Sequence, residues 1–260
     1  MPYVEVGESR LYYEDHGTGQ AIALLHGVGG NHASWFNQVP TLADGYRVIV
    51  IDQRGFGNST DAEGLGRSAF VGDLATLLDR LDIRKVVLIA QSMGGGTAVG
   101  FTCAHPDRVA GVVLCDTLVG IEPPAHIRPA MEATERATRD LPQAQRVLGP
   151  TTLARDRERT LLYLQIASFN SVNVRTVKGR FERHTPAELA ATCAPILFIA
   201  GEEDVLFEAS TIRAMSAATL GSRYVEISDA GHSAYFEMPN KFNELIIGFL
   251  DEINFNHRVT

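Results

Sequence analysis

The stretch LIAQSMGGGTA, Leu88 to Ala98, joins an aliphatic run to a serine and three glycines. The run KVVLIA that ends at residue 90 is typical of a buried strand, and residues 95–104 can form a helix. A serine at a sharp strand-to-helix turn is exposed as a nucleophile in the pattern G-x-S-x-G, because bulky residues two positions away would clash with the turn. Gly94 meets this demand, and Ala90, where glycine is usual, is also small. We therefore interpret Ser92 as a candidate nucleophile, with a purely structural turn as the alternative.

The composition favours a soluble globular protein without a nucleic-acid or membrane partner. The 260 residues carry a formal net charge of -8, which argues against binding to nucleic acid or to an anionic membrane. The N-terminus does not resemble a signal peptide, and no apolar run approaches the roughly 20 residues of a membrane helix. The sequence therefore predicts a cytoplasmic protein.

The three cysteines, Cys103, Cys115 and Cys193, fit neither a disulfide framework nor a metal site. Each lies among apolar neighbours, and we expect all three to be small core residues. No CxxC pair and no metal-ligand spacing of histidines is present. We predict that the protein uses no metal and no cofactor.

Short apolar runs alternate with helical patterns along the chain, which indicates a mainly parallel sheet covered by helices on both faces. The predicted strands are residues 3–6, 11–14, 21–25, 46–51, 85–90, 109–114, 195–200 and 223–227, and helical spacing is clearest in residues 68–81 and 240–253. Between the sixth and seventh of the main strands, residues 119–184 contain five prolines and helical patterns, such as 130–139 and 153–169, but no convincing strand. We predict a core of residues 1–119 and 185–260 with a helical insertion at 120–184.

Two backbone amides are candidates to stabilise a negative oxygen that forms beside Ser92. The Met93 N–H lies at a helix N-terminus, where negative charge is favoured. The second candidate is the Val28 N–H in the glycine-rich loop HGVGG, which directly follows the strand at 21–25. His26, at the start of that loop, is predicted to brace it rather than to act as a base.

A serine hydroxyl needs a base, usually histidine, which in turn needs a carboxylate to orient it. Of the eight histidines, His232 alone follows a late strand and a flexible Gly231 and precedes the final helix. Asp204, just behind the strand at 195–200, is the preferred carboxylate; Glu202 and Glu203 compete, and Asp116 after the preceding strand is an alternative.

The sequence resembles the α/β-hydrolase superfamily over nearly its whole length. The residues that carry the resemblance are HGVGG at 26–30, DQRGFGNS at 52–59, AQSMGG at 90–95, GEED at 201–204 and GH at 231–232, in the family order of serine, acid and histidine. The resemblance implies a mostly parallel eight-stranded sheet flanked by helices, with residues 120–184 as a helical lid after the sixth strand. It also implies that Asp52 and Arg54 organise neighbouring loops.

Within the superfamily the chain is similar to small serine esterases and lactonases, including 3-oxoadipate enol-lactonase-like enzymes. The leading hypothesis is therefore hydrolysis of a small-molecule ester or lactone through an acyl-enzyme. The alternatives are carbon–carbon bond hydrolysis of a dienoic or diketone substrate, cofactor-free perhydrolysis, and ligand sensing on a hydrolase fold. If the substrate of the carbon–carbon reaction carries a carboxylate, the candidates to neutralise it are Arg128, Arg175 and Arg180. A homo-oligomeric assembly is left open.

Overall fold

An eight-stranded sheet forms the centre of the protein, whose computed structural model describes residues 2–255. One of the eight histidines, His257, lies outside the described residues. The strands lie in the order β1-β2-β4-β3-β5-β6-β7-β8. Strand β2 is antiparallel to both of its neighbours, β1 and β4, and strands β3 to β8 run parallel to one another. Their bounds are β1 Tyr3–Val6, β2 Ser9–His16, β3 Ala21–Leu25, β4 Arg47–Ile51, β5 Val86–Gln91, β6 Val109–Cys115, β7 Ile196–Gly201 and β8 Arg223–Ile227. The predicted mostly parallel sheet is confirmed.

The central strands, β3 to β7, are almost entirely apolar because both faces of the sheet are covered there. In β5, Val86, Leu88 and Ala90 pack into one hydrophobic layer, whereas Val87 and Ile89 pack into the other. This alternation follows from the pleat of a strand, which directs successive side chains to opposite faces. A strand between two covered faces therefore needs apolar residues at every position.

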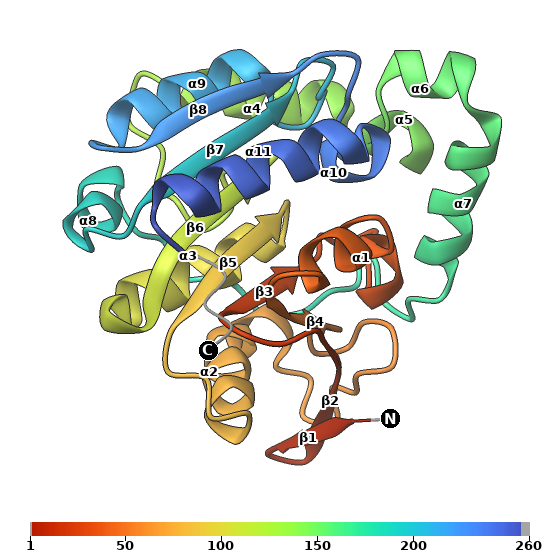
Figure 1. The fold of residues 1–260 in the computed structure, drawn as a ribbon. Helices are drawn as coiled ribbons and strands as arrows, with labels where there is room; N and C mark the ends of the chain where they lie inside the picture. Colours follow the sequence, from red (N-terminus) through yellow and green to blue (C-terminus); the bar gives the residue numbers. More distant parts are fainter. Residues whose placement is uncertain (1, 256–260) are drawn as a thin grey trace.

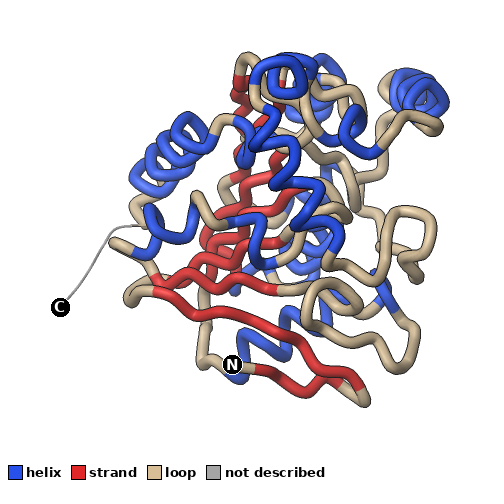
Figure 2. Tube along the Cα trace, turned by 90° about the vertical axis from the view of Figure 1, so that its right-hand side faces the viewer, coloured by secondary structure: helices blue, strands red, loops and turns tan. Residues whose placement is uncertain are grey.

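Helices cover the two faces of the sheet, as Figure 2 shows for the red strands between blue helices. One layer includes side chains of α2 (Phe70–Arg80), α3 (Gly94–Ala104), α8 (Pro186–Ala191) and α9 (Ala209–Ala218). The other includes side chains of α1 (Gln38–Ala43), α10 (Ala234–Glu237) and α11 (Pro239–Glu252). Every helix within residues 2–255 is too short or too polar to cross a lipid bilayer.

Four helices lie within residues 120–184, between β6 and β7, where the sequence predicts a helical insertion. They are α4 (Arg128–Thr138), α5 (Gln143–Val147), α6 (Pro150–Arg155) and α7 (Arg157–Ser168). The helical pattern at 153–169 is divided into α6 and α7 because Asp156 leaves the helical conformation and its side chain caps the N-terminus of α7. Figure 1 shows α5, α6 and α7 in green at the end of the sheet toward which the β5 arrow points. An isolated bridge between Ile121 and His184 joins the two ends of the segment.

The expectation that all three cysteines are core residues is wrong for one of them. Cys115 is buried at the end of β6 and Cys103 is partly buried, but Cys193 is exposed. Cys193 lies just after α8 with a φ of +57°, in a turn that leads into β7. The apolar neighbours of Cys193 in the sequence belong to a turn rather than to a buried strand.

Candidate active site

Ser92 occupies the turn between β5 and α3 in a left-handed backbone conformation, with a φ of +49°. Such a conformation costs a non-glycine residue about 1–3 kcal/mol and persists only where its surroundings impose it. Here the Ser92 N–H donates to the Cys115 carbonyl at 3.1 Å. The Ser92 carbonyl accepts from the Gly95 N–H at 2.9 Å and from the Thr117 hydroxyl at 2.6 Å. The turn thus presents a partly exposed Ser92 side chain at the carboxyl end of β5.

The residues around Ser92 are small for steric reasons. A Cβ on Gly94 would lie 2.2 Å from the Leu25 carbonyl oxygen, so only glycine fits there. Ala90 is completely buried, and its methyl group packs in the hydrophobic layer beside α3. The alanine at this position is therefore accommodated by the core. A Cβ on Gly96 would lie 2.6 Å from the Phe181 ring, which explains the third glycine of the run.

The structure brings Ser92, His232 and Asp204 into one chain of hydrogen bonds. Nε2 of His232 lies 2.8 Å from the Ser92 Oγ, and Nδ1 of His232 lies 3.0 Å from Oδ2 of Asp204. A carboxylate can only accept, so Nδ1 carries the hydrogen and Nε2 is left to accept from the Ser92 hydroxyl. The three residues follow β5, β8 and β7, whose carboxyl ends meet at one edge of the sheet.

Asp204 is itself fixed by backbone donors and acts on the protonation of His232. Its Oδ1 accepts from the Leu206 N–H at 2.7 Å and the Phe207 N–H at 3.1 Å, which leaves Oδ2 for the histidine. Burial of His232 lowers its pKa, but the Asp204 carboxylate, with Asp116 nearby, raises the pKa above the ordinary value. The site therefore favours an imidazolium more than water does.

The competing carboxylates have other partners. Glu202 is exposed, and Glu203 accepts from the N–H of Thr151 at 2.9 Å at the start of α6. Asp116 is completely buried and accepts from the Gly201 N–H at 2.7 Å and the Ala234 N–H at 3.1 Å. Burial and the charge of Asp204 raise the pKa of Asp116 to about 7. Asp116 thus joins the ends of β6 and β7 to α10, and Asp204 is the carboxylate bonded to the histidine.

The two predicted amide donors lie in the segments that flank Ser92. Gly27 approaches so closely that a Cβ there would lie 2.8 Å from the Ser92 Cβ. Within residues 2–255, neither the Val28 N–H nor the Met93 N–H donates to a protein acceptor. His26 braces this loop: its Nε2 accepts from the Gln53 N–H at 3.0 Å, so its Nδ1 donates to the Gly27 carbonyl at 2.7 Å.

Comparisons with known proteins agree with this fold. Residues 20–143 match the family model described as alpha/beta hydrolase fold. A Mycobacterium tuberculosis protein named as a non-heme bromoperoxidase, BpoC, is 30% identical over 264 residues, which cover 94% of this chain and 98% of that protein. The chain belongs to the α/β-hydrolase family. The family predicted from the sequence motifs is thereby confirmed.

Solved structures similar to this α/β hydrolase include an esterase and a lactonase. The thermophilic esterase from Thermogutta terrifontis superposes with a TM-score of 0.83 at 31% identity, over 99% of this chain and 100% of that one. The enol-lactonase from Burkholderia xenovorans LB400 gives a TM-score of 0.75 at 25% identity, over 96% of this chain and 100% of that one. The likeness to these two structures extends over nearly the whole length of the hydrolase.

Two buried polar residues of the hydrolase hold the His232 loop and were not predicted from the sequence. Gln91 Nε2 donates to the His232 carbonyl at 2.7 Å. Glu237, only 1% exposed, accepts from the backbone N–H groups of Gly231 at 2.9 Å and Ser233 at 3.2 Å, on either side of the histidine. It also accepts from the Gly149 N–H at 2.8 Å, in the segment before α6. The one signal in the sequence from which a buried charge could have been predicted is the position of this glutamate inside the apolar run AYFEMP.

The arginines considered for a substrate carboxylate lie on the surface of the hydrolase. Arg128 forms an ion pair with Glu122 at 2.6 Å, and Arg175 and Arg180 are exposed. The side chains of Val28 and Met93 instead belong to an apolar cluster that also contains Phe56, Phe70 and Val177. The side chains beside the candidate amides therefore pack in an apolar cluster.

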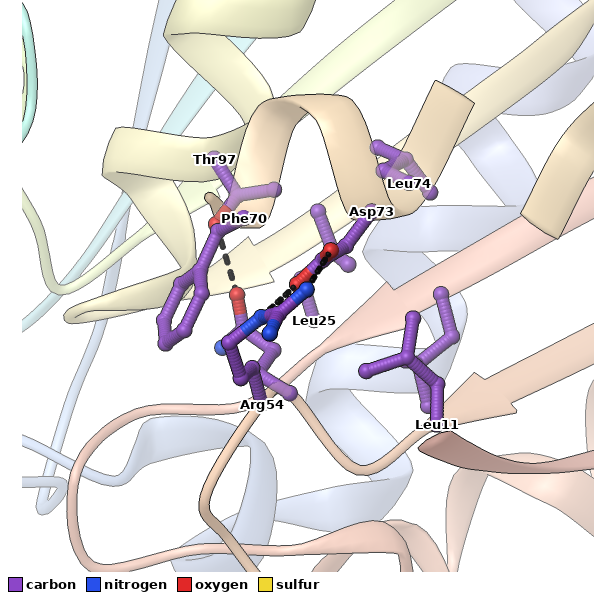
Figure 3. A pocket seen from close by; sticks show the side chains of 9 residues that line it. Leu11, Leu25, Arg54, Phe70, Asp73, Leu74 and Thr97 are labelled. Carbon is purple, nitrogen blue, oxygen red and sulfur yellow. Dashed lines mark hydrogen bonds and ion pairs between the residues drawn. The ribbon is translucent and has the colours of Figure 1, made fainter. Parts of the chain in front are cut away.

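The loop after β4 organises its neighbours through two buried charges, as the resemblance implies. Asp52 accepts from the N–H of His32 at 2.6 Å and of Asn58 at 2.8 Å. Arg54 points at Asp73 of α2, with nitrogen–oxygen distances of 2.7 and 2.8 Å (Figure 3). Beside this ion pair is a cavity of about 10 Å³, the size of one water, among apolar side chains of β2, β3 and α2. Its lining excludes Ser92, so the Arg54 region supports the fold rather than the chemistry.

Proposed function

We propose that this α/β hydrolase cleaves a small, uncharged ester or lactone by transferring its acyl group to Ser92. The proposal rests above all on the Ser92–His232–Asp204 chain, with contacts of 2.8 and 3.0 Å. These distances are those over which a nucleophile, a base and an orienting carboxylate act together. Similarity to an esterase and an enol-lactonase supports the substrate class.

In the proposed reaction the Ser92 Oγ attacks the substrate carbonyl carbon while His232 Nε2 takes the hydroxyl proton. Asp204 stabilises the imidazolium, and the Val28 and Met93 N–H groups bind the oxyanion. The tetrahedral intermediate collapses, and the leaving alcohol takes the proton from His232. A water then gives its proton to His232 and attacks the acyl-enzyme, which releases the acid and restores Ser92.

We also propose that residues 120–184 act as a lid over a core formed by residues 1–119 and 185–260. Tyr163 of α7 is buried in the hydrophobic layer that contains α10, next to the His232 loop. The hydroxyl of Tyr163 lies over the glycine-rich loop, 2.5 Å from where a Cβ on Gly29 would be. The segment therefore contacts both loops that contribute to the site. The apolar cluster around Val28 and Met93 favours an uncharged substrate.

The first test compares Ser92→Ala with the native enzyme on p-nitrophenyl acetate and with a fluorophosphonate probe. Removing a nucleophile of this type lowers kcat by about 10⁶-fold. Ser92→Ala is expected to lose nitrophenol release and probe labelling, whereas Ser210→Ala, on the exposed start of α9, keeps both. Full activity of Ser92→Ala would exclude the proposed mechanism.

A second candidate, perhydrolysis, is favoured by the 30% identity to a protein named as a bromoperoxidase. Hydrogen peroxide in place of water would attack the same acyl-enzyme and release a peracid. Peracid formation from acetate and peroxide, measured beside ester, lactone and 1,3-diketone hydrolysis, distinguishes these chemistries. A stoichiometric burst of nitrophenol without turnover would instead favour a ligand sensor.

A further inference from the structure

The Val28 amide belongs to a tight turn that is held at both ends. The Gly30 N–H donates to the Gly27 carbonyl at 3.0 Å, so Val28 and Gly29 form the centre of the turn. The Gly27 carbonyl also accepts from His26, which fixes the first end in the core. The direction of the Val28 N–H therefore depends on what fixes the other end, at Gly30.

Asn170, two residues after the end of α7, fixes that end. Its Nδ2 donates to the Gly30 carbonyl at 3.0 Å. Its Oδ1 accepts from the Gly57 N–H at 3.0 Å and from Asn31 Nδ2 at 3.3 Å. One side-chain amide thus joins the glycine-rich loop, the loop after β4 and the segment between β6 and β7. This needs both a donor and an acceptor on one short side chain, which asparagine supplies.

Two further contacts attach the same part of α7 to the turn. Asn31 Nδ2 also donates to the Ile166 carbonyl at 3.0 Å. The Tyr163 hydroxyl lies so close to Gly29 that a Cβ there would be only 2.5 Å away. Because both Tyr163 and Asn31 are buried, these contacts leave the turn little freedom to shift.

We propose that Asn170 is a positioning residue that sets the direction of the Val28 N–H toward the reacting oxygen. The inference rests on the proposed function, in which that amide binds the oxyanion. A preorganised donor stabilises the transition state without reorganisation during the reaction. A loosened turn therefore reduces the stabilisation of the transition state more than it reduces the binding of the substrate. Asn170 acts through Gly30 and the turn and does not itself meet the substrate.

The test measures kcat and KM of Asn170→Ala and Asn170→Asp on p-nitrophenyl acetate. Loss of a direct oxyanion donor costs about 10²–10³ in kcat, so a displaced donor is expected to cost about 10-fold, with KM within about 2-fold. Asn170→Asp keeps the acceptor for Gly57 but places an oxygen against the Gly30 carbonyl, so it is expected to lose at least as much. The pH midpoint of kcat/KM should not change in Asn170→Ala, because that variant alters no charge and Asn170 has no contact with the His232 chain.

Ser168→Ala is the matched control, since its exposed hydroxyl bonds the Gln165 carbonyl within α7. It should keep native kcat and KM. Native kcat in both Asn170 variants overturns the inference. A lower kcat together with a higher KM and a lower melting temperature also overturns it, because that combination indicates a merely structural role. The proposed function is judged separately: a Ser92→Ala variant without activity upholds it even if the Asn170 variants behave as native.

Discussion

The charge on Asp204 is the residue-scale feature that prepares His232 for its proposed role. Asp204→Asn keeps the shape but presents an amide to Nδ1, which favours the wrong tautomer of the imidazole. We expect kcat on p-nitrophenyl acetate to fall by about 10⁴-fold. Asp116→Asn removes a carboxylate bonded to Gly201 and Ala234 rather than to the histidine, and should cost less than about 10-fold. Equal losses in the two variants would mean that the acids share the role.

The pH dependence of kcat/KM follows from the surroundings of His232. Burial lowers the pKa of His232, but Asp204, Asp116 and Glu237 together raise it above the ordinary 6.5. His232 must be neutral to take a proton, so the rate falls as pH drops through this raised pKa. We expect a midpoint above 6.5 in a pH–rate profile. Asp116→Asn removes one negative neighbour and should lower the midpoint; a native midpoint below 6 would contradict the assignment.

At the scale of elements, Glu237 joins α10 to the His232 loop and to the segment before α6. Glutamine in its place keeps one acceptor but turns an NH₂ group toward backbone N–H donors, which leaves buried groups unsatisfied at about 1–3 kcal/mol each. We expect Glu237→Gln to lower both the melting temperature and the pH midpoint, because its charge raises the pKa of His232. Glu202→Gln, at an exposed position just after β7, is the matched control and should change neither. An unchanged midpoint would mean that Glu237 does not act on the histidine.

The elements themselves could largely be predicted from the sequence, because their patterns are local. The strand predicted at 85–90 and the helix predicted at 68–81 correspond to β5 and α2, with ends that differ by one or two residues. Ser92 and His232 were predictable for the same reason, since each lies in a recognisable turn. The sequence favours Asp204 but leaves Asp116 as an alternative, because both follow the carboxyl end of a strand.

Contacts between distant loops could not be predicted. Asn170 is 140 residues from its partner Gly30, and Gln91 is 141 residues from His232. The sequence around an asparagine or glutamine does not identify its distant hydrogen-bond partner, because that pairing depends on how the whole chain packs. The break in the predicted helix at Asp156 could be predicted only in part. Aspartate is a preferred N-cap residue, but the helical pattern in the sequence continues across it.

At the scale of the whole molecule, Arg54 ties separate parts of the core together. It pairs with Asp73 of α2 and Glu63, and donates to the Val6 carbonyl at the end of β1. Arg54→Met leaves Asp73 buried and unpaired, and should lower the free energy of unfolding by about 3–5 kcal/mol in urea titrations. Adding Asp73→Leu should recover much of this loss. Arg213→Met breaks an exposed pair with Glu226 and should cost less than about 1 kcal/mol; an equal cost would contradict the argument.

The two ends of α7 have a consequence for redesigning this enzyme. Near its first turn Arg159 donates to the Glu237 carbonyl, and just beyond its last turn Asn170 bonds Gly30. A cap grafted from a relative to alter substrate choice would replace both attachments at once. Such a chimera would inherit a new pocket together with a disturbed catalytic centre, unless the graft retains an arginine and an asparagine at these positions. We therefore expect substrate range and turnover to change together in such chimeras.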